Sequence, residues 1–120
     1  MKTTSERRDP ATIVRIEGKI IRENQAELRA KLEELMAAGA LLVALDLDKV
    51  EYMDSSALGC CASVQKSLRE RAGLLVVFGA SPNVEKMWKL IRLDLVIPLL
   101  ADEKEAIARL RAVSPPAPSP

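Results

Sequence analysis

The sequence has 120 residues, which is enough for one domain and too few for two ordinary ones. Hydrophobic residues make up 48% of it, so the chain can bury a core and is not globally disordered. Its 18 lysine and arginine residues nearly balance 17 aspartate and glutamate residues, for a net charge of +1. This balance gives no electrostatic case for nucleic acid as a partner.

The chemistry open to the chain is narrow. It has no histidine, which excludes imidazole general bases, histidine-containing zinc sites and the Ser-His-Asp triad. Its only cysteines, Cys60 and Cys61, are neighbours, so they can neither staple the fold nor complete a four-cysteine metal site. We therefore expect no metal, no cofactor and no enzymatic activity. An enzyme that uses Asp54 and Ser56 is the alternative.

The same features indicate a cellular compartment. Free, adjacent thiols fit the reducing cytoplasm, so we expect a cytoplasmic protein. No apolar run reaches the roughly 18–20 residues that a membrane helix needs, and the polar N-terminus has no signal-peptide core. We therefore expect neither direct membrane insertion nor secretion.

Hydrophobic periodicity predicts strands that alternate with helices. Residues 1–10 are expected to be a flexible N-terminus. The expected elements that follow are a strand over 11–17, a short extended piece at 20–21, a helix over 24–38 and a strand over 41–47. Asn24 is the predicted N-cap of the helix, and Gly39 the glycine that ends it. The strand over 41–47 is almost entirely apolar, which predicts that both of its faces are covered.

The second half continues the alternation. It is expected to hold a helix over 55–72 ended by Gly73, a strand over 74–78, a helix from Ser81 to about residue 93, a short strand over 95–97 and a last helix through Leu110. Pro82 at the first helical position, and a capping box from Asp102 and Glu105, support the last two helix starts. Residues 113–120 are rich in proline and are expected to form a disordered tail.

This order predicts an α/β domain over residues 11–112. Strands joined by helices imply a mixed, mostly parallel sheet, here of about four to five strands with about four helices. The first strand, which ends in a turn at Gly18, is expected to pair antiparallel at an edge.

One polar segment lies where such sheets place functional groups. Asp54, Ser55 and Ser56 follow a buried strand and open a helix, and functional residues gather beyond the carboxyl ends of parallel strands. The simplest interpretation is that Asp54 caps the helix and the two serines fill its first turn.

The helix that follows has an unusual second side. A helical wheel places its large apolar residues on one side and small residues on the other. A solvated helix face normally carries long charged side chains, so a small face predicts close packing, against a partner protein or against a neighbouring helix of the domain. The predicted partner-binding residues are Ser56, Ala57, Gly59, Cys60, Ser63 and Ser67.

The run VALDLDKVEYMDSSALG over residues 43–59, together with the GLLVV run from Gly73 and the SPNV run from Ser81, resembles a STAS domain. That module occurs in bacterial anti-sigma factor antagonists, in stressosome proteins and at the end of sulfate transporters. The resemblance extends from about residue 11 to residue 110. In the family a partner kinase phosphorylates a serine of the Asp-Ser-Ser segment. This implies phosphorylation of Ser56, with Asp54 and Ser55 supporting the site.

The resemblance implies an anti-sigma factor antagonist that works by partner switching. The unphosphorylated protein would bind a serine-kinase anti-sigma factor, phosphorylation would end that complex, and a Ser/Thr phosphatase would restore it. Two alternatives are a scaffold subunit of a stressosome-like assembly and a regulatory subunit of a membrane transporter complex. Ala57 and Ile21 stand where the family usually has glycine and often has aspartate. A domain kept only for docking or assembly would carry such changes.

Overall fold

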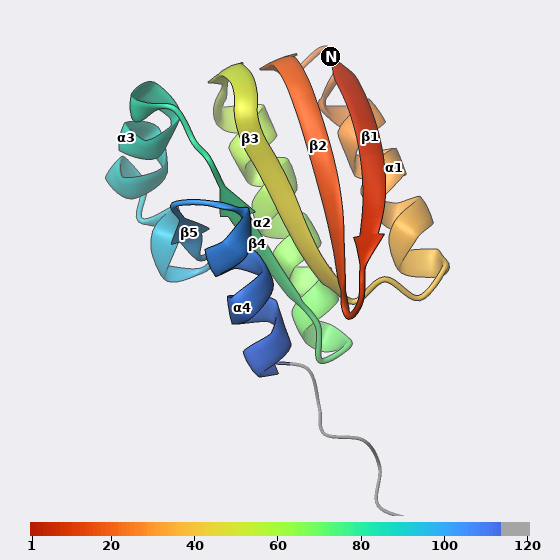
Figure 1. The fold of residues 1–120 in the computed structure, drawn as a ribbon. Coiled ribbons are helices and arrows are strands. Elements are labelled where there is room, and N and C mark those ends of the chain that lie inside the picture. The colour runs from red at the N-terminus through yellow and green to blue at the C-terminus, as the bar shows by residue number, and fades with distance from the viewer. Residues whose placement is uncertain (114–120) are drawn as a thin grey trace, which may run out of the picture.

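The computed structural model describes residues 1–113, in which one five-stranded sheet carries helices on both faces (Figure 1). The strands lie in the order β1 (Lys2–Arg8), β2 (Ala11–Ile20), β3 (Leu42–Met53), β4 (Leu74–Phe78) and β5 (Leu99–Leu100). The β1–β2 pair is antiparallel and the other three pairs are parallel. The predicted mixed, mostly parallel sheet is confirmed.

The helices are α1 (Gln25–Ala37), α2 (Ser55–Glu70), α3 (Pro82–Leu90) and α4 (Glu103–Val113), with a short 3-10 helix η1 (Leu93–Leu95) after α3. In Figure 1, α1 and α2 lie side by side behind the sheet and α4 crosses its front. No helix within residues 1–113 is long and apolar enough to cross a membrane.

The sheet divides the core in two. One face packs under α1, α2 and α3 and buries the larger set of apolar residues. The other face packs under α4, where Ala106 and Leu110 cover residues such as Ala44 and Val76. Both faces of β4 and of the first half of β3 are therefore covered, which explains the nearly unbroken apolar sequence there and confirms the prediction for the 42–47 part of β3.

The predicted flexible N-terminus is wrong, because residues 2–8 form β1 at the edge of the sheet. The strand expected over residues 11–17 is β2; it pairs antiparallel with β1, but it lies inside the sheet, between β1 and β3, and not at the expected edge. Most side chains of β1 are exposed and polar, so it has no hydrophobic period to reveal it. Backbone hydrogen bonds to β2 hold β1 in place, and hydrophobic periodicity in the sequence does not predict such bonds.

The predicted strand over 95–97 is also wrong. Helix α3 ends at Leu90, and Arg92 adopts a left-handed φ of +60° before η1. The Trp88 Nε1–H donates to the Ile97 carbonyl at 3.3 Å, which holds this turn against the core. The ladder to β4 starts at Pro98, whose carbonyl accepts from the Val77 N–H, and β5 follows it.

Some of the predicted helix-end residues play the predicted role, and others play a different one. Gly39 has a φ of +100° and ends α1 as predicted. Asn24 precedes α1, but its side chain accepts from the Ile21 N–H and donates to the Lys19 carbonyl at the end of β2, and does not cap the helix. After α2, the left-handed residue is Ala72. Gly73 is required for a different reason, because a Cβ there would lie 2.3 Å from the Leu41 carbonyl oxygen.

The last helix begins as predicted. The Asp102 Oδ1 accepts from the Glu105 N–H at 2.9 Å, and the Glu105 carboxylate accepts from the Ala101 N–H at 3.0 Å. Of the predicted tail, Val113 is the last residue of α4, and residues 114–120 lie outside the described part of the chain.

Candidate functional site

The start of α2 is held in place by Asp54. Its Oδ1 accepts from the Ala57 N–H at 2.9 Å, and its Oδ2 accepts from the Arg22 N–H at 2.8 Å. The N–H of Ala57 and, after it, that of Arg22 lower the pKa of the Asp54 carboxyl. The side chain therefore caps the helix, as predicted, and ties the β2–α1 loop to it. Each oxygen accepts from a backbone N–H, so Asp54 acts as a structural anion at the start of α2.

The two serines that follow differ in accessibility. Ser55 is exposed, whereas Ser56 is half-buried. Both lie in the first turn of α2, where unpaired backbone amides and the helix dipole favour an added negative charge.

Part of the predicted small face remains open. Gly59 is exposed, and apart from its chain neighbours and its own helix backbone, no heavy atom lies within 4 Å of the point where its Cβ would be. Ser63 is half-buried and Ser67 is exposed further along the helix. Together with Ser56 these residues form the small-residue face of α2, which another backbone can approach closely.

Two residues predicted to contact a partner are buried, and that prediction is wrong for them. Ala57 is 0% exposed and Cys60 is 2% exposed. The Cys60 thiol lies 3.9 Å from the Gln25 carbonyl oxygen, because α1 covers this side of α2. For Cys60 the alternative interpretation, packing against a neighbouring helix, is the correct one. Burial raises the pKa of the Cys60 thiol and raises that of Cys61 to about 12.

Sequence reasoning missed Gln65, a polar side chain on the buried side of α2. It is 1% exposed and bonds to the backbone of Leu75 in β4 and to the carbonyl of Val96 beyond η1. Its position four residues after Cys61, on the apolar side of the helical wheel, is the signal that marks it.

A second missed feature adjoins Asp54. Tyr52, near the end of β3, is 46% exposed. It lines a mainly apolar pocket of about 280 Å³ whose other wall is α3, through residues that include Val84 and Met87. An exposed aromatic side chain two residues before the cap extends the candidate surface from α2 toward α3.

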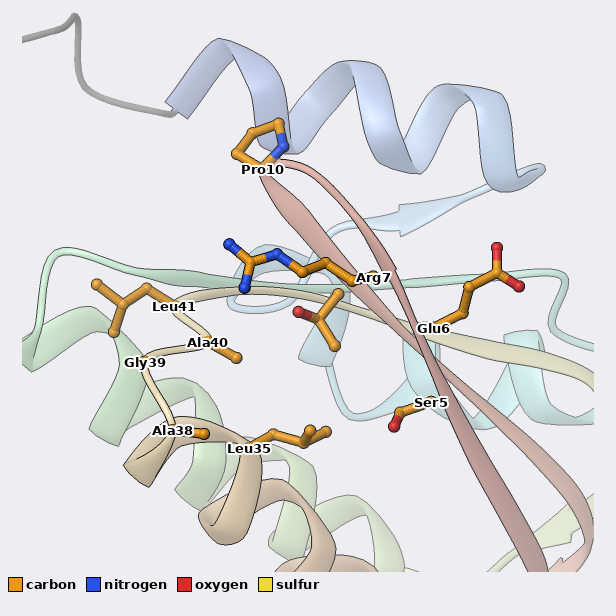
Figure 2. A pocket seen from close by; sticks show the side chains of 10 residues that line it. Ser5, Glu6, Arg7, Pro10, Leu35, Ala38, Gly39, Ala40 and Leu41 are labelled. Carbon is orange, nitrogen blue, oxygen red and sulfur yellow. The ribbon is translucent and has the colours of Figure 1, made fainter.

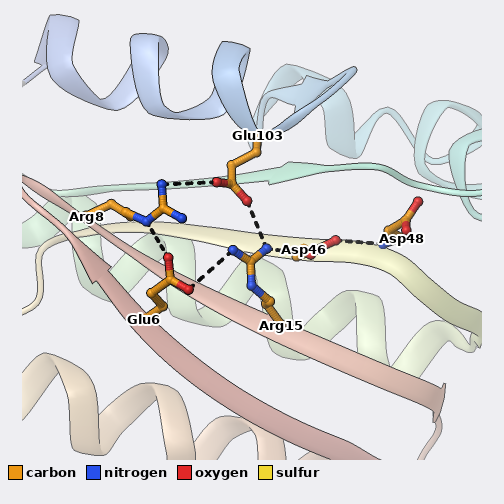
Figure 3. Close-up of polar contacts among 6 residues, drawn as sticks. All are labelled: Glu6, Arg8, Arg15, Asp46, Asp48 and Glu103. Carbon is orange, nitrogen blue, oxygen red and sulfur yellow. Dashed lines mark hydrogen bonds and ion pairs between the residues drawn. The ribbon is translucent and has the colours of Figure 1, made fainter.

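Two further features lie away from α2. Between β1 and the end of α1 lies a pocket of about 180 Å³, where Ser5 and Arg7 face Leu35 and the 38–41 segment (Figure 2). On the α4 side of the sheet, Arg15 Nη1 contacts Asp46 and Glu103 at 2.9 Å each (Figure 3). Within residues 1–113, no group of three or more potential metal ligands gathers.

Known proteins match this chain along nearly its whole length. Residues 2–106 match the family model of the STAS domain. The anti-sigma-B factor antagonist of Listeria monocytogenes is 30% identical over 90 residues, which cover 75% of this chain and 79% of the relative.

Solved structures share the fold. The anti-sigma factor antagonist from Mycobacterium paratuberculosis superposes with a TM-score of 0.84 at 24% identity, covering 92% of this chain and 93% of that one. The Bacillus cell fate determinant SpoIIAA in its phosphorylated form has a TM-score of 0.71 at 22% identity, covering 92% and 100%. With the family model spanning both the sheet and the start of α2, the chain belongs to the STAS domain family.

Proposed function

We propose that this protein is an anti-sigma factor antagonist controlled by phosphorylation at the start of α2. The observation that carries the proposal is an accessible serine pair at a helix N-terminus, fixed by Asp54 and continued by the small-residue face of α2. The name of the Listeria relative supports the antagonist role. SpoIIAA, which has the same fold, was solved in a phosphorylated form.

The kinase would supply the chemistry and this chain the acceptor. We propose that the partner supplies the general base and ATP, because each oxygen of Asp54 already accepts from a backbone N–H and the pKa of its carboxyl is lowered. The resemblance implies Ser56 as the acceptor, whereas exposure favours Ser55. We therefore propose that one hydroxyl of this pair is phosphorylated, and that mapping of the modified residue distinguishes the two.

Phosphate would act on the complex and leave the fold intact. It adds about −1.5 to −2 charges at neutral pH. On the free protein that charge meets the amides at the start of α2, which stabilise it. In the complex, the bulky hydrated anion would lie between a partner and a surface of small residues such as Gly59, and desolvating an anion without a partner charge is costly. A Ser/Thr phosphatase would then restore binding.

The experiment is a phosphorylation assay with a purified serine-kinase anti-sigma factor and ATP. We expect one phosphate, mapped by mass spectrometry to residues 55–56, and its loss when the modified serine is changed to alanine. Ser63→Ala and Ser67→Ala, on the same helix, are matched controls that keep full incorporation. A wild-type protein that takes up no phosphate contradicts the proposal. Assembly into very large particles with related chains would then support the scaffold role, and co-purification with a permease the transporter role.

A further inference from the structure

The turn after α3 exposes an unusual cluster of aliphatic side chains. Seven large hydrophobic residues of the described chain are exposed, and four of them fall within one short segment. These four are Leu90 at 76%, Ile91 at 55%, Leu95 at 74% and Val96 at 54% exposure. Since α3 packs against η1, the two pairs lie on one stretch of surface, here called the α3–η1 patch. Clustered exposed apolar residues rimmed by charge mark interaction sites.

The patch is fixed by the core beneath it. Leu93 is buried in the middle of the segment, and the Val96 carbonyl accepts from the Gln65 amide at 2.8 Å. Trp88 holds the neighbouring Ile97 carbonyl. The exposed side chains therefore project from a turn anchored on both sides, so binding has little backbone to order and loses little entropy.

Two charged residues within the patch, one basic and one acidic, indicate what kind of partner binds there. Arg92 and Asp94 flank Leu93, both are exposed, and neither takes part in an ion pair among the described residues. Glu85 and, more weakly, Asp94 raise the pKa of Lys89, so Asp94 lies near that ammonium group. A two-fold axis through the patch would place Arg92 of each copy opposite Asp94 of the other and would stack the aliphatic residues between them. Such self-complementarity is the requirement of an isologous interface. A net charge of +1 opposes association little.

We propose that the α3–η1 patch pairs with the same patch of a second copy of this chain. The interface is small, so the dimer is weak and reversible. It also leaves the serine pair free. Ser55 follows the carboxyl end of β3, whereas α3 runs back from that edge of the sheet and the patch lies at the far end of α3 (Figure 1). This proposal does not depend on the phosphorylation of either serine.

The test is sedimentation equilibrium of the full chain at micromolar to millimolar concentrations. We expect a monomer–dimer equilibrium that Leu95→Ser weakens by roughly tenfold or more. Leu41→Ser is the matched control, because Leu41 is an exposed leucine outside the patch and its change leaves dimerisation unaltered. A melting curve for each variant separates lost association from lost folding.

A charge-reversal cycle tests the pairing itself. Arg92→Asp and Asp94→Arg should each weaken the dimer by placing like charges together, and the double variant should restore it. Aspartate tolerates the left-handed backbone at residue 92, so the first variant keeps the turn. A protein that stays monomeric at every concentration overturns the proposal. So does a dimer that Leu95→Ser leaves unchanged, or a double variant that dimerises no better than either single variant.

Discussion

Gln65 and Leu75 share two hydrogen bonds that align a side-chain amide with the backbone of a central strand. Gln65 Nε2 donates to the Leu75 carbonyl at 3.0 Å, and the Leu75 N–H donates to Gln65 Oε1 at 2.8 Å. Nε2 also donates to the Val96 carbonyl at 2.8 Å. One buried side chain therefore joins α2, β4 and the base of the α3–η1 patch.

Gln65→Ala should lower the free energy of unfolding by about 3 kcal/mol, because it leaves the buried backbone groups of Leu75 and the part-buried Val96 carbonyl without this partner and opens a cavity. Urea unfolding measures the change. Ser67→Ala, an exposed site on the same helix, is the control and should shift stability by less than about 0.5 kcal/mol. Equal stability of the Gln65 variant and the wild type would show that these bonds contribute nothing net.

Arg15 contacts three carboxylates, of which Asp46 and Glu103 at 2.9 Å are nearer than Glu6 at 3.6 Å (Figure 3). Arg15→Met should lower stability by about 1–2 kcal/mol, because it leaves the Asp46 and Glu103 carboxylates without the cation they share; the half-exposed site screens part of this effect. Arg7→Met is the control, since its pair with Asp9 is exposed and should contribute under about 0.5 kcal/mol. Equal losses in the two unfolding curves would contradict the difference in burial.

The sequence predicts those elements whose own side chains decide their environment. The strand Leu74–Phe78 is apolar throughout because it is covered on both faces, and its predicted bounds agree with the structure. Ser81 and Pro82 likewise start α3 where they are predicted to. By contrast, β1 depends on pairing with β2, and nothing in its polar side chains signals that pairing.

The candidate site divides in the same way. The capping role of Asp54 depends on residues within the next turn, so local sequence predicts it. The burial of Cys60 depends instead on where α1 packs, which the local sequence does not specify. A helical wheel assigns one buried side to a helix, but α2 is buried both by the sheet and by α1, so Cys60 is covered while Gly59 beside it is open.

Both thiols should react slowly with a thiol-specific reagent in the folded protein. The thiolate is the reactive form, and burial raises the pKa of Cys60 and raises that of Cys61 to about 12. Cys61 should be the slower of the two, because Cys60 lies at the boundary between α1 and α2. Cys60→Ala and Cys61→Ala assign the two rates, and unfolding in urea provides the reference for free reaction. If Cys60 reacted as fast as in urea, α1 would not cover it in solution.

Asp54 should make stability depend on pH in the acid range. Its pKa is lowered in the folded state, first by the Ala57 N–H, so its contribution is complete above the unfolded-state pKa of about 3.9 and is lost as pH falls through the folded-state value. Asp54→Asn should therefore lower the melting temperature at neutral pH, and this difference should shrink as the solution is acidified. Asp48→Asn, which removes an exposed carboxylate from β3, is the control. A difference that stays constant with pH would exclude a role for the Asp54 charge.

Ser55→Asp and Ser56→Asp should separate folding from binding. Both positions lie in the first turn of α2, where an added negative charge interacts favourably with the helix dipole, so each variant should melt at or slightly above the wild-type temperature. Ser67→Asp, near the end of the same helix, should melt slightly lower because the dipole has the opposite sign there.

Binding to the serine-kinase partner should respond differently. We expect an aspartate at the phosphorylated position to weaken the complex at least tenfold, about 1.4 kcal/mol, since a charge must be desolvated against the small-residue face of α2. Ser5→Asp on β1 adds the same charge far from that face and should bind as the wild type does. Titration calorimetry with the purified partner measures all three variants. If both α2 variants bound like the wild type while their melting curves stayed native, a charge at the start of α2 would not control the complex, and the phosphorylation switch would be wrong.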